Sequence, residues 1–352
     1  RRIFRAVTRD MGGETHFHEH PLSQASGQEE FGIDTAWFGP RDASKVLVMI
    51  SGTHGPELLA GTAMQLRWMQ QYSQAVDAGT AVLLIHAANP YGCAHIRRTT
   101  ERNVDLNRNF CDFSTGGKAG TLTHKVQDML SYSGASGPRT MKIFLRLFYL
   151  ICRHGIQDIT EEIAKGQYVR ADGVGYGGME PEWANRTIRS ICKDHFSAAK
   201  HIAIIDWHTG IGSYGEPTFL CFDEPGTPES ERVVSWFGKR AMNAESDYVS
   251  GERPNYQGLL VLALQNIARE LGAQTTALVI EFGTYSNTKM LRGLIYDRWL
   301  QNAGKNVRDA DIAVIQDRLS DLFYPPSENW QKSVEQQGDV ILCQVMSGLG
   351  KW

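Results

Sequence analysis

Val46 to Glu57, with the sequence VLVMISGTHGPE, is the stretch that decides the fold. The apolar run at its start predicts a buried strand, and the glycine-flanked turn that follows places His54 and Glu57 at the end of that strand. Two later segments repeat the pattern: IIDWHTG carries His208 and LVIEFG carries Glu281. In an open α/β sheet, ligands bind outside the carboxyl ends of the strands. We therefore expect the three segments to form one site.

The segments around this stretch alternate between strand-like and helix-like patterns. This alternation is typical of a parallel sheet that is covered by helices. We predict an α/β protein with a mixed, largely parallel twisted sheet, helices on both faces and an antiparallel edge formed by residues 1–45. The further predicted elements are helix Glu57 to Tyr72, strand Ala81 to Ala87, helix Trp183 to Ala199, strand Thr218 to Phe222, helix Glu229 to Met242 and helix Leu259 to Leu271.

The chain is predicted to form a single domain over residues 1–352, with an insertion at residues 112–170. Glycines mark the start of this insertion, and a helical pattern from Met141 to Lys165 follows. We expect the insertion to cross outside the sheet as a lid or substrate wall. The tail after Ser286 is predicted to be mostly helical.

The charge pattern argues against polyanionic partners. The formal net charge is -3, and acidic and basic residues are interleaved, so neither nucleic acid nor a membrane is an expected partner. The six cysteines have no paired spacing, which favours a reduced compartment, the cytoplasm. Because the chain starts at Arg1, export stays open. The sequence does not indicate an oligomeric state.

His54, Glu57 and His208 match the set of ligands that catalytic zinc takes, two imidazoles and a carboxylate with one position left for water. We therefore predict one bound Zn²⁺ ion. A second His-x-x-Glu pair, His16 and Glu19, lacks a preceding apolar strand. The alternatives are histidines that only form hydrogen bonds at strand ends, or a structural metal site, which would need a fourth protein ligand.

Glu281 ends an apolar run, so its carboxylate is expected either in a structural ion pair or at the mouth of a site. Apolar surroundings raise the pKa of a carboxyl group toward neutrality, which suits a general base. We therefore predict that Glu281 takes a proton from metal-bound water.

The loop NVDLNRNF contains three candidate site residues, Asp105, Asn107 and Arg108. Arg108 and Asn107 together can bind a substrate carboxylate through a guanidinium fork and an amide donor. Asp105 can accept the ring N–H of His54 and so fix its tautomer. The alternative is a polar loop that is held together by its own Asx turns. One of the arginines just upstream can stabilise an oxyanion, and the candidates are Arg97, Arg98 and Arg102.

With these residues in place, the chain resembles the zinc carboxypeptidase superfamily, the clan that also holds aspartoacylases and succinylglutamate desuccinylases. Closer still, it resembles an uncharacterised bacterial branch of carboxypeptidase-like proteins. The resemblance runs from about Val46 to Ser286 and rests on the segments HGPE, RRTTERNVDLNRNF, GQYVRADGVGYGGMEPEWANRT, IDWHTGIGSYG and VIEFGTY. It implies one zinc carboxypeptidase-like catalytic domain with zinc on His54, Glu57 and His208.

The resemblance also implies roles for the remaining residues. Asn107 and Arg108 recognise the substrate carboxylate, Glu281 is the general base, and Arg98 matches the arginine that stabilises the oxyanion, with Arg97 and Arg102 as alternatives. A tyrosine ahead of the base contacts substrate; Tyr256 is the candidate for this role and Tyr248 is the alternative.

Three functions are compatible with these residues. The first is a zinc-dependent hydrolase of the metallocarboxypeptidase type, which cleaves an amide bond next to a free carboxylate in a small peptide. The second is an N-acyl amino acid deacylase. The third is a carboxylate-binding protein without turnover, which the presence of Glu281 disfavours.

Overall fold

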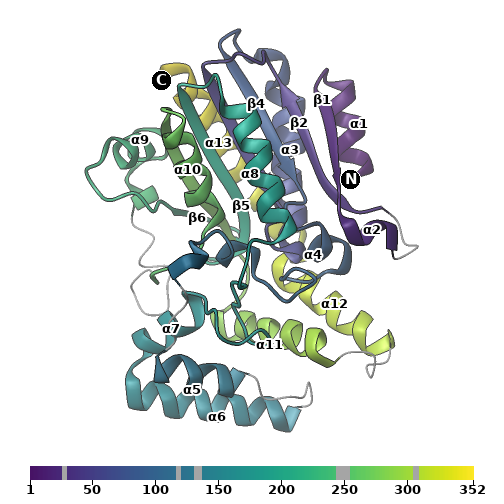
Figure 1. Ribbon diagram of the computed structural model, residues 1–352, viewed down its shortest axis with the longest axis vertical. Coiled ribbons are helices and arrows are strands. Elements are labelled where there is room, and N and C mark those ends of the chain that lie inside the picture. Colours follow the sequence, from purple (N-terminus) through teal and green to yellow (C-terminus); the bar gives the residue numbers. More distant parts are fainter. Residues whose placement is uncertain (26–29, 116–119, 131–136, 243–253, 304–308) are drawn as a thin grey trace.

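A computed structural model of the protein describes residues 1–25, 30–115, 120–130, 137–242, 254–303 and 309–352. Its centre is a seven-stranded sheet in the order β1-β2-β4-β3-β5-β7-β6 (Figure 1). The strands are β1 (Glu14–Glu19), β2 (Gly32–Phe38), β3 (Lys45–Ser51), β4 (Thr80–His86), β5 (His201–Gly210), β6 (Pro217–Leu220) and β7 (Gln274–Gly283).

The four central strands β4, β3, β5 and β7 are parallel to one another. The strands on both sides of them are antiparallel to their neighbours. This arrangement confirms the predicted mixed sheet, which is parallel in its centre, with residues 1–45 providing an antiparallel edge. Because the central strands are parallel, their carboxyl ends lie at one edge of the sheet.

Helices cover both faces of the sheet (Figure 1). On one face, α8 and α10 contact each other, and on the other face α3 and α9 contact α13. The helices are α1 (Arg2–Asp10), α2 (Pro21–Ala25), α3 (Leu58–Tyr72), α4 (Pro90–His95), α5 (Thr121–Leu130), α6 (Gly137–His154), α7 (Ile156–Ala164), α8 (Trp183–Phe196), α9 (Pro228–Phe237), α10 (Leu260–Glu270), α11 (Asn287–Ala303), α12 (Asp309–Phe323) and α13 (Glu328–Lys351).

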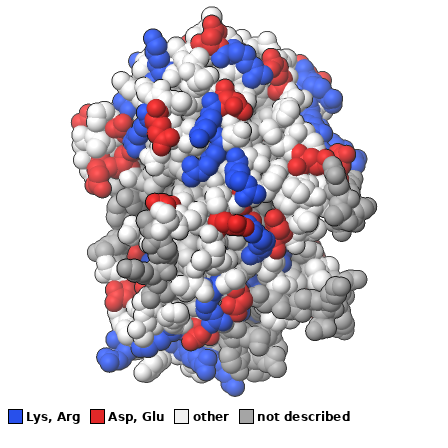
Figure 2. All heavy atoms as spheres, in the orientation of Figure 1, with Lys and Arg blue, Asp and Glu red and all other residues white. Residues whose placement is uncertain are grey.

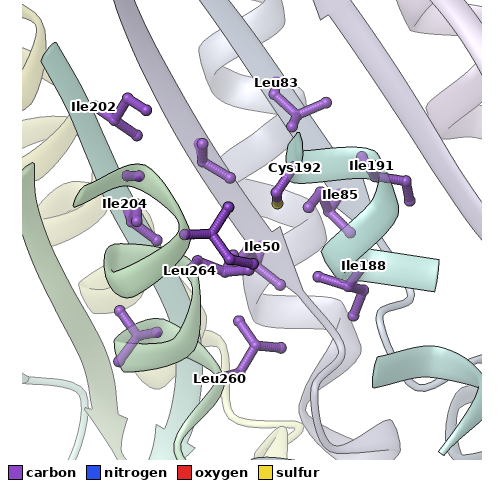
Figure 3. Packing of buried hydrophobic residues seen from close by; sticks show 14 of the residues in the cluster. Ile50, Leu83, Ile85, Ile188, Ile191, Cys192, Ile202, Ile204, Leu260 and Leu264 are labelled. Carbon is purple, nitrogen blue, oxygen red and sulfur yellow. The ribbon is translucent and has the colours of Figure 1, made fainter. Parts of the chain in front are cut away.

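Side chains of the central strands alternate between two hydrophobic cores. In β3, Val48 and Ile50 enter the core beneath α8 and α10, whereas Leu47 and Met49 enter the core beneath α3 and α13. Figure 3 shows the first core, where Ile50 lies near Leu264 of α10. Strands buried on both faces need apolar residues at every position, and the central strands meet this need nearly throughout. Polar side chains therefore gather where the strands end.

The insertion has a small apolar core of its own, in which α5, α6 and α7 pack together and against α11. The predicted helical pattern from Met141 to Lys165 is present as α6 and α7, and it is interrupted at Gly155, whose φ of 88° a helix does not permit. The glycines Gly116, Gly117 and Gly134, which mark the start of the insertion in the sequence, lie outside the described residues.

Three further observations concern the surface, the thiols and the helices. Acidic and basic side chains are interspersed over the face shown in Figure 2. All six cysteines are free thiols. Among the described residues, no helix combines the length and the apolar character that crossing a bilayer requires.

Candidate metal centre

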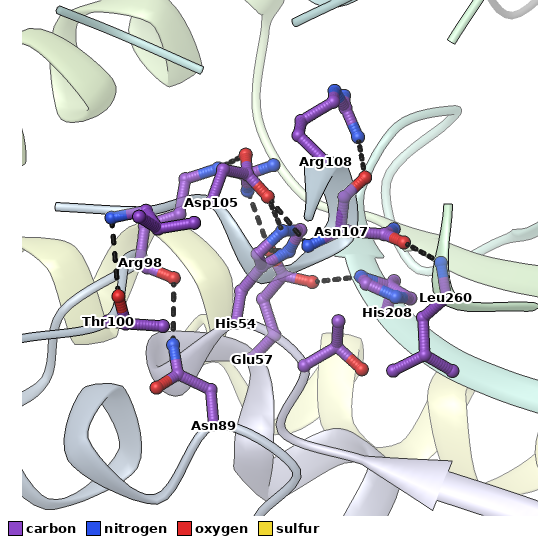
Figure 4. A network of polar contacts seen from close by, with 12 residues as sticks. His54, Glu57, Asn89, Arg98, Thr100, Asp105, Asn107, Arg108, His208 and Leu260 are labelled. Carbon is purple, nitrogen blue, oxygen red and sulfur yellow. Dashed lines mark hydrogen bonds and ion pairs between the residues drawn. The ribbon is translucent and has the colours of Figure 1, made fainter. Parts of the chain in front are cut away.

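His54, Glu57 and His208 meet at the carboxyl ends of β3 and β5 (Figure 4). The Nδ1 atom of His54 lies 2.9 Å from one oxygen of the Glu57 carboxylate, and the Nδ1 atom of His208 lies 2.8 Å from the other. One potential ligand atom from each residue lies within 4.8 Å of the others, and all three side chains are buried. The structure thus brings the three predicted ligands together.

Two glycines explain why the chain can turn here. Gly52 follows β3 with a φ of 73°, a conformation that glycine adopts without strain. Gly55 lies against the neighbouring loop so closely that a Cβ atom on it would lie 2.0 Å from the carbonyl oxygen of Gly92. Its N–H donates to the carbonyl of Arg97. The turn that presents His54 is therefore pressed against backbone and has little room for movement.

Two further carboxylates hold the outer nitrogens of the imidazoles. The Nε2 atom of His54 lies 3.1 Å from Asp105, and that of His208 lies 2.8 Å from Asp206. The hydroxyl of Thr53 donates to the other oxygen of Asp206. Carboxylates in this position orient the ring of a metal-binding histidine and make it a stronger ligand. Both Nδ1 atoms therefore face the centre.

Sequence reasoning missed Asp206, although a signal for it exists. Asp206 precedes His208 by two positions in the same strand, so the two side chains lie on the same face of the sheet. Asp105 contacts His54 and also forms an Asx turn in its own loop, so the two interpretations of this loop are compatible. The carboxylate oxygen that contacts His54 also accepts the backbone N–H of Asn107 at 3.0 Å, which is an Asx turn.

The electrostatics of the group favour a cation. Burial disfavours the charged form of His208, but the carboxylates of Asp206 and Glu57 outweigh it and raise its pKa well above the ordinary value. Burial likewise opposes ionisation of Glu57, yet His54 and His208 hold its pKa well below the usual range. Histidine nitrogens and a carboxylate that bind a metal ion do so in their deprotonated forms, so a metal ion at this place would displace protons.

Glu281 lies beside this group, because it is the register partner of His208 on β7. Its side chain is only 8 % exposed, and among the described residues its Oε2 atom is buried without a hydrogen-bond partner. Burial raises the pKa of Glu281 to about 7. This shift has the direction and the cause expected from the sequence. In the part of the chain that the structure describes, Glu281 forms no ion pair of the kind that a structural role would require.

Of the three candidate arginines, the structure brings Arg98 to the centre. Its NH1 atom donates to Glu57 at 3.1 Å and its Nε atom to Asp105 at 3.3 Å. Burial disfavours its charge, but Asp105 and Glu57 offset this and raise the pKa of Arg98 above the ordinary value. The guanidinium thus belongs to the same charge network as the candidate ligands.

The two alternative arginines are engaged elsewhere. Arg97 is buried and forms an ion pair with Asp297 of α11, with 2.5 Å between Nε and the carboxylate oxygen. Arg102 pairs with Glu180 and Glu182 near the surface. Neither guanidinium contacts His54 or Glu57 in these pairs.

Arg108 is anchored by carbonyl groups. Its Nε and NH2 atoms both donate to the carbonyl of Ala164, at the end of α7, and its NH1 atom donates to the carbonyl of Asn107. Its guanidinium carbon lies 4.9 Å from the ring centroid of Tyr256. These bonds use three of its five N–H groups and leave one on each terminal nitrogen for a ligand. Tyr248, the alternative tyrosine, lies outside the described residues.

The site opens into a cavity of about 420 Å³, a volume ordinary for a small-molecule site. Apolar side chains of α6 and α7 line part of it. The predicted site residues that line the cavity are His54, Glu57, Arg98, Asp105, Asn107, Arg108, Tyr256 and Glu281.

The fold and the site define the class of protein: a mixed α/β sheet that carries a buried His-Glu-His group at the ends of its parallel strands, the arrangement implied by the resemblance to the zinc carboxypeptidase superfamily. The chain belongs to the family described as "Protein of unknown function (DUF2817)", whose model matches residues 1–337. A comparison with curated proteins gives no match.

The chain is similar to several solved structures. Carboxypeptidase A from Helicoverpa armigera is 13% identical over 90% of this chain and 71% of that one, with a TM-score of 0.42. A succinylglutamate desuccinylase from a Silicibacter species is 10% identical over 83% of this chain and 67% of that one, with a TM-score of 0.40. Bovine thrombin-activatable fibrinolysis inhibitor is 10% identical over 91% and 94%, with a TM-score of 0.41.

Proposed function

We propose that the protein is a zinc-dependent hydrolase that cleaves an amide bond next to a free carboxylate. The observation that carries this proposal is the juxtaposition of a buried His-Glu-His group with a carboxylate oxygen of Glu281 that has no hydrogen-bond partner among the described residues. A structural metal site would close its coordination with a fourth protein ligand. Among the described residues, only three candidate ligands meet here.

The donor set fits zinc. His54, Glu57 and His208 supply two imidazole nitrogens and a carboxylate, and Asp105 and Asp206 orient the two rings. When bound by these residues, a zinc ion would supply polarisation of a carbonyl group and a lower pKa of bound water.

Glu281 acts as the general base. With a pKa of about 7, its carboxylate is available near neutral pH and its protonated form is still a competent acid. It takes a proton from the attacking water, whose oxygen forms the new C–O bond, and it returns the proton to the amine nitrogen as the C–N bond breaks. Because Glu281 accepts one proton and then delivers it, the hydrolysis needs no second proton-transfer group.

Arg98 and Arg108 bind the two polar ends of the substrate. Arg98 lines the cavity beside Glu57, where its guanidinium can donate to the oxyanion of a tetrahedral intermediate. Arg108 presents its two remaining N–H groups to the free carboxylate, Asn107 adds an amide, and Tyr256 packs on the guanidinium.

The substrate is therefore either a small peptide, as for a metallocarboxypeptidase, or an N-acyl amino acid, as for a deacylase. The experiment that tests the proposal is metal analysis of the purified protein with a screen of peptides and N-acyl amino acids, with and without chelator. We expect about one zinc per chain and chelator-sensitive release of a free amino acid. Full activity in the metal-free protein would refute the proposal. Stoichiometric zinc without turnover of any substrate would favour the non-catalytic binding protein instead.

A further inference from the structure

One wall of the cavity is apolar and has no part in the proposed chemistry. We define this acyl wall by six side chains from three helices: Leu147 and Ile151 of α6, Ile159 and Ile163 of α7, and Leu291 and Leu294 of α11. Five of the six are only partly buried, so apolar surface remains exposed to the cavity. In a folded protein such a surface next to a reactive centre is a candidate for binding an apolar group.

The acyl wall offers no charge to a polar substituent. Among the described residues, α6, α7 and α11 contribute no ionisable side chain to the cavity. Of the three polar side chains that they do contribute, Thr160 donates its hydroxyl to the carbonyl of Ile156 within its own helix, whereas Asn287 and Thr288 lie at the start of α11, outside the acyl wall. A carboxylate placed against this wall would lose its hydration without gaining a partner. The wall therefore disfavours dicarboxylic acyl groups such as succinyl.

The cavity has a second apolar region, and it adjoins the carboxylate clamp. Phe222 packs edge-on against Tyr256, with 6.2 Å between the ring centroids. Leu259 is the neighbour of Leu260, whose backbone N–H donates to the side-chain oxygen of Asn107. Because Asn107 and Arg108 hold the free carboxylate in the proposed function, this region faces the side chain of the released amino acid. The remaining apolar substituent of the substrate is the acyl group.

The acyl wall begins at the metal centre. Met290, on the first turns of α11, lies so near Gly210 that a Cβ atom there would be 3.4 Å from its Cε. Gly210 follows His208 by two residues on β5, and the hydroxyl of Thr284, three residues after Glu281, contacts the sulfur of Met290. From this point α11 leads into the apolar core of the insertion, where Leu291 packs.

We propose that the acyl wall binds an aliphatic acyl chain, so that the substrates are N-acyl amino acids with acyl groups of medium length. This inference rests on the proposed function and selects its deacylase form. Each additional methylene of the acyl chain that packs on the wall buries more apolar surface. One buried methylene is worth at most about fourfold in kcat/KM, the ratio that corresponds to about 0.8 kcal/mol.

The test is a series of N-acetyl, N-butanoyl, N-hexanoyl, N-octanoyl and N-decanoyl derivatives of one amino acid, together with its N-succinyl derivative. We expect kcat/KM to rise with chain length by about two- to fourfold per methylene until the wall is covered, and the succinyl compound to be the poorest. Equal kcat/KM for acetyl and decanoyl compounds, or preference for succinyl, would overturn the inference.

Two leucines on the same helix provide matched variants. Leu147 lines the cavity, whereas Leu145 is 62% exposed on α6 and is not part of the cavity lining. Leu147→Trp fills space at the wall and should reduce the octanoyl-to-acetyl ratio of kcat/KM by at least tenfold. Leu145→Trp should leave that ratio unchanged. A ratio that responds equally to both variants would contradict the assignment of the wall.

Binding to the zinc-loaded Glu281→Gln variant separates this inference from the proposed function. Calorimetric Kd values for the same series should fall as the acyl chain lengthens, although no turnover occurs. If affinity rises with chain length but the wild-type protein hydrolyses none of the compounds, the proposed function fails and the acyl wall stands. If the wild-type protein hydrolyses them all and affinity is independent of length, the acyl wall fails alone.

Discussion

His208 and Glu281 are register partners on the adjacent parallel strands β5 and β7. Partners in neighbouring strands project on the same face, so the candidate ligand and the candidate base emerge side by side. The backbone hydrogen bonds of the sheet fix their separation, and no loop intervenes. The separation of the candidate ligand from the candidate base is thus set by the sheet itself.

Replacing Glu281 with Gln should remove the base while preserving the centre. We expect kcat to fall by about 10²- to 10⁴-fold, the usual contribution of a general base, with an unchanged zinc content. Steady-state kinetics and metal analysis on the same preparation check this. The exposed Glu224→Gln is the control. Retention of full kcat in Glu281→Gln would remove Glu281 from the mechanism.

The raised pKa of Glu281 predicts an acidic limb in the pH profile. The carboxylate, which is the active form, predominates only above the folded pKa of about 7. The kcat/KM value should therefore be level above this pH and fall about tenfold per unit below it. The same shift means that the contribution of this group to the stability of the metal-free protein is present below pH 4.5 and is lost as the pH rises through about 7. A profile that stays flat down to pH 5 would contradict the role.

The carboxylate clamp can be tested with paired substrates. Arg108→Ala should raise KM for substrates with a free carboxylate by about 10- to 100-fold, because a charge-assisted hydrogen bond is lost. Amidated analogues, which lack that charge, should be affected far less. Arg102→Ala, which removes the partner of the exposed Glu180 and of the buried Glu182 away from the metal centre, serves as the control, with KM measured on the folded protein. Equal losses for both substrate types would show that Arg108 has only a structural role.

We expect Asp206 to strengthen zinc binding. Asp206→Asn leaves the shape of the side chain but weakens its hold on the Nε2 atom of His208. Zinc affinity should fall by about 10- to 100-fold, as measured by competition with a chelator dye. Asp223→Asn, a carboxylate that bonds Gln265 and Arg269 away from the centre, should leave zinc affinity unchanged.

Substitution of Arg97 should affect stability, whereas substitution of Arg98 should affect catalysis. Arg97→Met leaves Asp297 buried without its partner and should lower the free energy of unfolding by about 3–5 kcal/mol, with little change in kcat per folded molecule. Arg98→Met should instead lower kcat by about 10²- to 10³-fold, the cost of one oxyanion donor. Denaturant titration and kinetics of both variants are the measurements. The reverse pattern would transfer the catalytic role to Arg97.

The sequence was sufficient to predict the parallel centre of the sheet and the residues at its edge. In strands buried on both faces, polar residues stand out at the ends of apolar runs, and His54, His208 and Glu281 were found by this contrast. The choice among Arg97, Arg98 and Arg102 needed either the resemblance or the structure. All three lie in one loop, and only the contacts of each with distant carboxylates distinguish them.

Other features escaped prediction because their causes are not local. Helix α1 forms within residues 1–45, for which the sequence predicted only an antiparallel edge. Its Phe4 is buried against His86, and its Arg5 pairs with Asp34 of β2. Helix α5 lies in the first part of the insertion, for which no helix was predicted. In both cases, contacts with residues far away in the sequence stabilise a helix that the local pattern does not indicate.

The bond from Arg108 to the carbonyl of Ala164 joins the clamp to the last turn of the insertion. A shortened chain without residues 112–170 would keep the sheet and the His-Glu-His group, yet its guanidinium would swing free of its anchor. This shortened protein should lose its selectivity for substrates with a free carboxylate while it still binds zinc. Exchanging this segment between homologues should therefore change the part of the acyl wall formed by α6 and α7 and, at the same time, the anchor of Arg108.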